Sequence, residues 1–154
     1  IYVRLAKGYD PIVTTETKSF EIGKGVIYRD GKDALILTTG ITLNIAMKAA
    51  EKLVKQGIDS SIIHCHTVKP IDSTTILNMV SNIPIIITVE EHSVIGGLGT
   101  AVAELIAESN FNPSKKFKRI GIPDTFPDQY GSQSSLMEKY SITADGIVKV
   151  ISNI

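Results

Sequence analysis

A short segment that mixes acids and a histidine is the part of this sequence best suited to chemistry. Glu90, Glu91 and His92 follow an apolar run, and carboxylates and imidazoles are the groups that most often transfer protons in enzymes. Two interpretations of His92 stay open. It either contacts a substrate or cofactor directly, or it serves in packing, in capping or in a hydrogen bond between subunits.

Three glycines follow shortly after His92 and predict a loop that contacts a ligand or a partner. Gly96, Gly97 and Gly99 let the backbone approach whatever lies above it. The helical pattern that follows leaves free N–H groups at its start, and these favour an anion or an acidic group. The third glycine of a dinucleotide-binding fingerprint is missing. We therefore expect a functional edge here rather than a nicotinamide or flavin site.

Histidine and cysteine also occur together in the middle of the chain. His64, Cys65 and His66 look like a metal-binding cluster at first. Strand alternation, however, would place the two histidines on one face and the cysteine on the other. A structural strand is therefore the favoured interpretation, and we predict no metal site in this chain.

Two groups of basic residues could bind phosphate or nucleic acid. Arg4 could grip a phosphate bidentately together with Lys7, and the alternative is a solvated charge at a strand end. The run Lys115–Arg119 holds four basic residues and one aromatic. With a formal net charge of zero and no second basic patch, a solvated strand edge is favoured over a nucleic-acid site.

A regular alternation of apolar runs and amphipathic stretches must position these residues. Strands are predicted over residues 34–39, 60–68, 83–89 and 117–122, with a short strand or arm over 20–29. Helices are predicted from 42 to a stop at Gly57, from 72 or 73 to 80, and over 100–109, 134–140 and 143–151. Strands that alternate with single helices call for a mostly parallel sheet covered on both faces. The sequence therefore predicts a three-layer α/β/α domain.

In such sheets, ligands or partners meet the carboxyl ends of the strands. Four loops should therefore lie along one edge of the predicted sheet: Thr39–Gly40, His66–Val68, Glu90–His92 and Pro123–Asp124.

Composition limits the classes of function. The 154 residues suit one domain, and sixteen basic residues balance sixteen acidic ones, so no global field attracts nucleic acid or an acidic membrane. Cys65 is the only cysteine, which excludes an internal disulfide and fits a reducing compartment, so we expect a cytoplasmic protein. No basic-then-apolar leader is present, and the longest apolar run, near residues 83–89, is of strand length. We expect no membrane insertion.

Four segments, taken in order, resemble the successive signatures of the C-terminal domain of transketolase and related thiamine diphosphate enzymes. They are Asp33–Gly40, His66–Asp72, Val89–Gly99 and Gly121–Phe126. The resemblance covers nearly the whole chain. It implies an α/β/α sandwich around a five-stranded, largely parallel sheet with one antiparallel strand, which would be the strand that ends near Arg29.

The resemblance also implies a division of the chain. Residues 1–20 would be the tail of a preceding pyrimidine-binding domain plus a linker, and residues 21–154 the C-terminal domain. Arg4 would lie where family members place an arginine that binds substrate phosphate. In this family a Gly-Asp-Gly motif and an asparagine of the first domain hold thiamine diphosphate and magnesium, and a glutamate of the second activates the thiamine ring. This sequence contains no Gly-Asp-Gly. We therefore expect no catalytic residue in this chain and no cofactor binding by it alone.

The same resemblance implies partners. The parent assembly would transfer a two-carbon ketol unit between sugar phosphates, and this domain would pack on the remaining transketolase domains or an N-terminal subunit and support a homodimer. We expect the interface and active-site edge to include six residues: Glu91, His92, Gly96, Gly97, Gly99 and Asp124. A bulky residue at Gly97 should then weaken assembly and leave the domain folded.

Alternatives within and outside the family remain. The chain is also similar to the equivalent domain of deoxyxylulose phosphate synthase and of the beta subunit of a 2-oxo-acid dehydrogenase. A binding module without catalysis is a third possibility. The amino-acid sequence of residues 90–97 and 122–126 favours the split, small-subunit type of transketolase.

Overall fold

One sheet organises this protein, whose computed structural model describes residues 1–3, 12 and 20–154. Its strands are β1 (Val26–Arg29), β2 (Ala34–Thr38), β3 (Ser60–His64), β4 (Ile85–Ser93) and β5 (Lys116–Ile122). They lie in the order β1-β3-β2-β4-β5. β1 pairs antiparallel with β3, whereas the other neighbours are parallel. The predicted five-stranded sheet with one antiparallel strand is confirmed.

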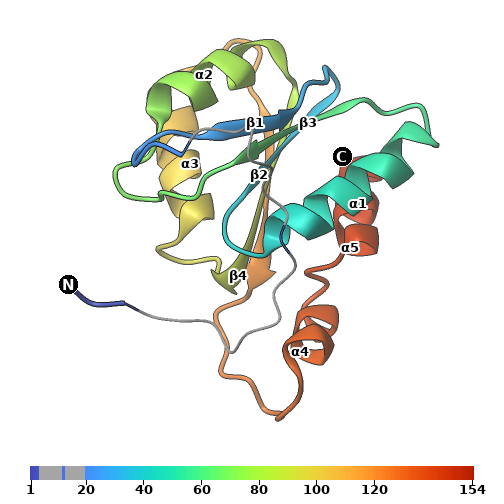
Figure 1. Cartoon of the computed structure of the whole chain (residues 1–154). Helices are drawn as coiled ribbons and strands as arrows, with labels where there is room; N and C mark the ends of the chain where they lie inside the picture. Colours follow the sequence, from blue (N-terminus) through green and yellow to red (C-terminus); the bar gives the residue numbers. More distant parts are fainter. Residues whose placement is uncertain (4–11, 13–19) are drawn as a thin grey trace.

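Helices cover both faces of this sheet (Figure 1). They are α1 (Thr42–Val54), α2 (Ser73–Asn82), α3 (Leu98–Glu108), α4 (Gln133–Lys139) and α5 (Ala144–Ser152). α1 and α5 pack on one face, over a core that includes Ile36 and Ile62, and α2 and α3 pack on the other, over Leu35 and Leu37. β2 and β3 are buried along their whole length, as expected for parallel strands between two helical layers. The three-layer prediction is therefore confirmed.

Local sequence signals set several helix boundaries. The Asp72 side chain accepts a hydrogen bond from Thr75 N at 3.2 Å and caps α2, and Thr143 caps α5 through Gly146 N at 3.0 Å. Each such cap stabilises a helix by about 1 kcal/mol. Gly57, with φ of 77°, follows the end of α1 in the left-handed conformation that glycine favours. These termini agree with the sequence prediction.

Several predicted boundaries were wrong, and one of them changes the site. β4 does not end at Val89 but continues to Ser93, because Ser93 still pairs with Ile122 of β5. The residues from Glu90 to His92 therefore belong to a strand and not to the loop after it. β3 ends at His64 instead of Val68, and α3 begins two residues earlier than predicted, at Leu98. Within the described ranges, no helix is both long and apolar enough to cross a bilayer.

Candidate functional site

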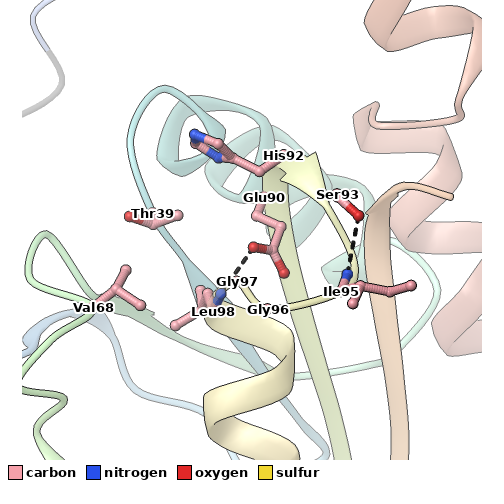
Figure 2. Close-up of a pocket in the computed structure, with 9 residues that line it drawn as sticks. All are labelled: Thr39, Val68, Glu90, His92, Ser93, Ile95, Gly96, Gly97 and Leu98. Atoms are coloured by element: carbon pink, nitrogen blue, oxygen red, sulfur yellow. Dashed lines mark hydrogen bonds between the residues drawn. The ribbon is translucent and has the colours of Figure 1, made fainter. Parts of the chain in front are cut away.

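The carboxyl ends of three neighbouring strands meet at an open pocket of about 410 Å³ (Figure 2). Thr39 follows β2, Val68 lies in the connection after β3, and the remaining lining comes from the end of β4 and the loop to α3, between Glu90 and Leu98. The prediction that these loops share one edge of the sheet is confirmed for these three.

Glu90 supplies the anion that the start of α3 requires. Its side chain is 1% exposed, and its two carboxylate oxygens accept hydrogen bonds from Leu98 N and Gly99 N, each at 2.8 Å. Gly97, the N-cap residue, has no side chain that could do this. A carboxylate at this position also interacts favourably with the positive end of the helix dipole. The predicted acidic group at this helix start is therefore the protein's own Glu90 (Figure 2).

This arrangement decides whether a phosphate group fits at the helix start. The N–H groups of Leu98 and Gly99 that would bind it are already engaged by Glu90. A second anion would also face a buried carboxylate at short range, where charges of the same sign repel strongly. The start of α3 therefore does not fit the diphosphate of thiamine diphosphate, nor that of a dinucleotide.

Two of the three loop glycines are needed for packing inside the domain. A Cβ atom at Gly97 would lie 1.9 Å from Glu90 Oε2. Gly99 is buried, and a Cβ there would lie 2.7 Å from Arg119 Cδ and 2.8 Å from Thr88 Oγ1. A bulky residue at Gly97 would therefore displace the Glu90 carboxylate. The expectation that such a change weakens assembly and leaves the domain folded stays a prediction, and the structure adds that the change should lower the stability of the domain. Of the three loop glycines, only Gly96 faces open space.

Glu91 and His92 take separate positions in the site. Glu91 Oε2 accepts a hydrogen bond from Gln133 Nε2 at 2.9 Å, which ties the end of β4 to the start of α4. His92 is exposed at the pocket, and its ring points away from the Glu90 carboxylate (Figure 2). The structure therefore does not bring these acids and the histidine together as one proton-transfer group.

Arg119 has a role that the sequence did not reveal. Its guanidinium donates hydrogen bonds to Val94 O at 2.7 Å and to Thr100 Oγ1 at 3.3 Å. Arg119 thereby fastens the loop before α3 onto β5. Lys116 and Lys118 are exposed along this edge strand, in agreement with the predicted solvated strand edge.

The histidine pair shows the geometry predicted from strand alternation. The rings of His64 and His66 lie 6.4 Å apart on one side, whereas Cys65 is buried in the core under α2 and α3. Burial, and then the charge of His66, lowers the pKa of His64 to about 4. Burial, and then Asp72, raises the pKa of the Cys65 thiol to about 12, so this thiol is unreactive. Among the residues with described positions, no cluster of three or more His, Cys, Asp or Glu could hold a metal ion.

The remaining predicted site residues are Arg4 and Asp124. Arg4 lies outside the described residues. Asp124 is exposed just after β5, in the connection to α4. Sequence reasoning missed Gln133, the partner of Glu91, and it gave no role to Tyr130 in the same connection. No local pattern marks Gln133, because its contact spans 42 positions of the chain.

Comparison with known proteins gives consistent results. The family model for the transketolase C-terminal domain matches residues 23–147. A 6-deoxy-6-sulfo-D-fructose transketolase subunit, SqwH of Clostridium sp. (strain MSTE9), is 38% identical over 149 residues, 97% of this chain. A 1-deoxy-D-xylulose-5-phosphate synthase of Halothermothrix orenii is 37% identical over 143 residues, 93% of this chain.

A solved structure described as a split gene transketolase, inactive beta4 tetramer, superposes with a TM-score of 0.84 at 34% identity and covers 93% of this chain. The chain spans only part of each relative: 45% of the SqwH subunit, 22% of the synthase and 46% of the solved chain.

Proposed function

Because this chain belongs to the transketolase C-terminal domain family, we propose that it acts as the C-terminal part of a thiamine diphosphate-dependent transferase. The complete enzyme transfers a two-carbon ketol unit between sugar phosphates. This chain contributes no catalytic residue and does not bind the cofactor alone. The cofactor and its magnesium are held by the remaining domains or by an N-terminal subunit, on which this chain packs. Two copies of this complete enzyme unit form a homodimer.

The length of the relatives is the observation that carries this proposal. The chain is matched over 97% of its residues by a transketolase subunit of which it spans only 45%. A domain that forms less than half of a homologous subunit supports a role within a larger unit. The helix start that Glu90 fills gives further support, because its N–H groups are no longer free to bind the diphosphate of the cofactor.

Within the assembly, we assign the pocket edge to subunit or domain contact. Glu91, His92, Gly96 and Asp124 are at least partly exposed on the carboxyl-end side, so they are available to a partner. Gly97 and Gly99 act indirectly, because they shape the loop from inside. We assign residues 1–20 to the tail of a pyrimidine-binding domain and its linker, residues 21–154 to the C-terminal domain, and Arg4 to a substrate phosphate.

A second candidate function has one specific observation in its favour. A 1-deoxy-D-xylulose-5-phosphate synthase is 37% identical to this chain, almost as similar as the transketolase subunit at 38%. Both candidates are thiamine diphosphate enzymes, so the domain and its role in assembly would be the same. The substrates and the reaction would differ.

A transfer assay on the complete native protein tests the proposal. The protein is purified from its source cells and supplied with thiamine diphosphate, magnesium, a panel of ketose phosphates and an aldose phosphate acceptor. A parallel reaction replaces the ketose phosphates with pyruvate, which a 1-deoxy product requires as its two-carbon donor. We expect ketol transfer by the complete protein and none by the 154-residue chain. Formation of 1-deoxy-D-xylulose 5-phosphate would favour the synthase instead. Absence of both activities would contradict the proposal and leave a binding module.

A further inference from the structure

Two aromatic side chains stand in solvent beside the candidate site. They belong to residues 123–132, which connect β5 to α4 and which we name the aromatic arm. Phe126 is 96% exposed and Tyr130 is 107% exposed. The arm extends below the carboxyl ends of β4 and β5 in Figure 1, clear of the two helical layers. Aromatic residues contribute most when buried, so two fully exposed ones in a short segment mark an interaction surface.

Contacts at both ends fix where the arm leaves and rejoins the domain. At its start, Val94 N donates to Ile122 O at 2.9 Å. At its end, Gln133 donates to Glu91, and an ion pair joins Lys139 of α4 to Asp128 within the arm. A segment anchored in this way loses less conformational entropy on binding than a free one. The arm is therefore suited to present its aromatic side chains to a partner.

The charges around the arm indicate the chemistry of that partner. Glu91 lies next to the end of the arm and Asp124 lies within the arm, and neither forms a salt bridge with a Lys or Arg among the residues that the structure describes. The surface therefore combines exposed aromatic rings with two carboxylates that have no cationic partner within the described part of the chain. Its complement is an apolar hollow with basic side chains at the rim.

We propose that the aromatic arm docks into an apolar hollow, flanked by Lys or Arg, on the part of the complete enzyme that lies outside this domain. This inference rests on the proposed function, which supplies the larger assembly. More than half of the SqwH subunit and of the solved split-gene chain lies outside the matched region, so ample surface exists there. A symmetric contact between two arms is disfavoured, because it would bring their carboxylates together.

Photo-crosslinking identifies the occupant. Tyr130 is replaced by p-benzoylphenylalanine in the complete native enzyme, which is purified, irradiated and mapped by mass spectrometry of its peptides. We expect a crosslink to residues outside the domain described here. A crosslink to residues 20–154 of a second copy would overturn the proposal, since the occupant would then be another copy of this domain.

Hydroxyl-radical labelling of the complete enzyme measures burial independently. A synthetic peptide with the sequence of residues 123–133 gives the rate for a free side chain. We expect Tyr130 in the enzyme to be labelled about tenfold more slowly than in the peptide, as for a residue buried at an interface. Equal rates would show that the arm is free in the assembly and would overturn the proposal whatever the crosslinking gives.

Paired variants test the energetic role. In the complete enzyme, we expect Phe126→Ala with Tyr130→Ala to weaken the association of its parts on the order of 100-fold, as for interface anchors. Val54→Ala is the control, because Val54 is another exposed apolar residue, at 50%, but it ends α1, far from the arm in sequence. Equal effects of the two changes would contradict the proposal.

Ketol transfer is measured separately, so that this inference and the proposed function can fail independently. An active enzyme with a free arm refutes only this inference. A docked arm without transfer activity refutes only the proposed function.

Discussion

Replacement of Gly97 by alanine tests how the site loop is built. Gly97 has φ of −100° and ψ of −155°, a conformation that alanine adopts without strain, so the backbone itself does not oppose the change. The new Cβ, however, would lie 1.9 Å from Glu90 Oε2 and 2.9 Å from its Cδ. The Glu90 carboxylate must therefore leave the helix start and give up its bonds to Leu98 N and Gly99 N.

The two lost hydrogen bonds set the size of the effect. A hydrogen bond to a charged group contributes about 1.5–3 kcal/mol, so the two together contribute about 3–6 kcal/mol. A carboxylate that swings out recovers part of its hydration, so we expect a loss near the lower value, about 3 kcal/mol. For a domain of this size, that lowers the melting temperature by roughly 6–12 °C.

A double-mutant cycle assigns the loss to this contact. The free energy of unfolding is measured by urea titration for wild type, Gly97→Ala, Glu90→Ala and the double variant. We expect Gly97→Ala to cost about 3 kcal/mol in the wild type and less than about 1 kcal/mol without the Glu90 side chain. Gly96→Ala is the neighbouring control: its Cβ meets open space, and only the positive φ of 77° opposes it, at about 1–2 kcal/mol in either background. If Gly97→Ala costs the same with and without Glu90, the reasoning is refuted.

Three further predictions concern the sheet and its edges. Because the pKa of His64 falls from 6.5 to about 4 on folding, the native state holds the neutral ring, and stability is lost as the pH falls from about 6.5 toward 4. Urea titrations should show that the free energy of unfolding falls by about 2 kcal/mol between pH 7 and pH 5, and that His64→Gln largely removes this loss. An unchanged pH dependence in that variant would contradict the assignment. Burial pushes the pKa of Asp72 up, but hydrogen bonds from Gly25 and Thr75 and the charge of Lys24 outweigh it and lower the pKa, so its stabilisation is present above about pH 4 and is lost in more acidic solution. Asp72→Ala should cost about 2 kcal/mol at pH 7, and thermal melts should show a smaller difference from wild type near pH 2; a difference independent of pH would count against this. At Gly31, a Cβ would lie 2.5 Å from the backbone carbonyl carbon of Ser60, so Gly31→Ala should cost about 3 kcal/mol or more in urea titrations, against about 1–2 kcal/mol for Gly57→Ala, whose Cβ meets open space; equal costs would refute the close approach.

Much of the fold could be predicted because its signals are local. The buried run over residues 34–38, the cap at Asp72 and the glycine after α1 each lie within a few residues of the feature that they determine. Periodicity could not give the direction of β1. Its pairing with β3 joins Val26 to His64 across a long stretch of chain, and only the family resemblance indicated that it is antiparallel.

The site was harder to predict because its contacts are not local. The cap of α3 comes from Glu90, eight residues before Leu98. The N-cap position itself holds a glycine and no Ser, Thr, Asp or Asn, so the usual sequence signal for a helix start is missing. Pairing with β5 extends β4 to Ser93, and this depends on a strand more than twenty residues further along the chain. The glycine cluster correctly indicated close approach of the backbone. What approaches it is the protein's own carboxylate.

Native mass spectrometry of the protein from its source cells, with thiamine diphosphate and magnesium added, tests the central claim most directly. The account predicts that this domain occurs within a longer chain or a complex well above 16.7 kDa, and that the larger species binds the cofactor while the isolated chain does not. If the cells make only the 16.7 kDa chain, with no associated subunit and no bound thiamine diphosphate, the chain is not part of such an enzyme.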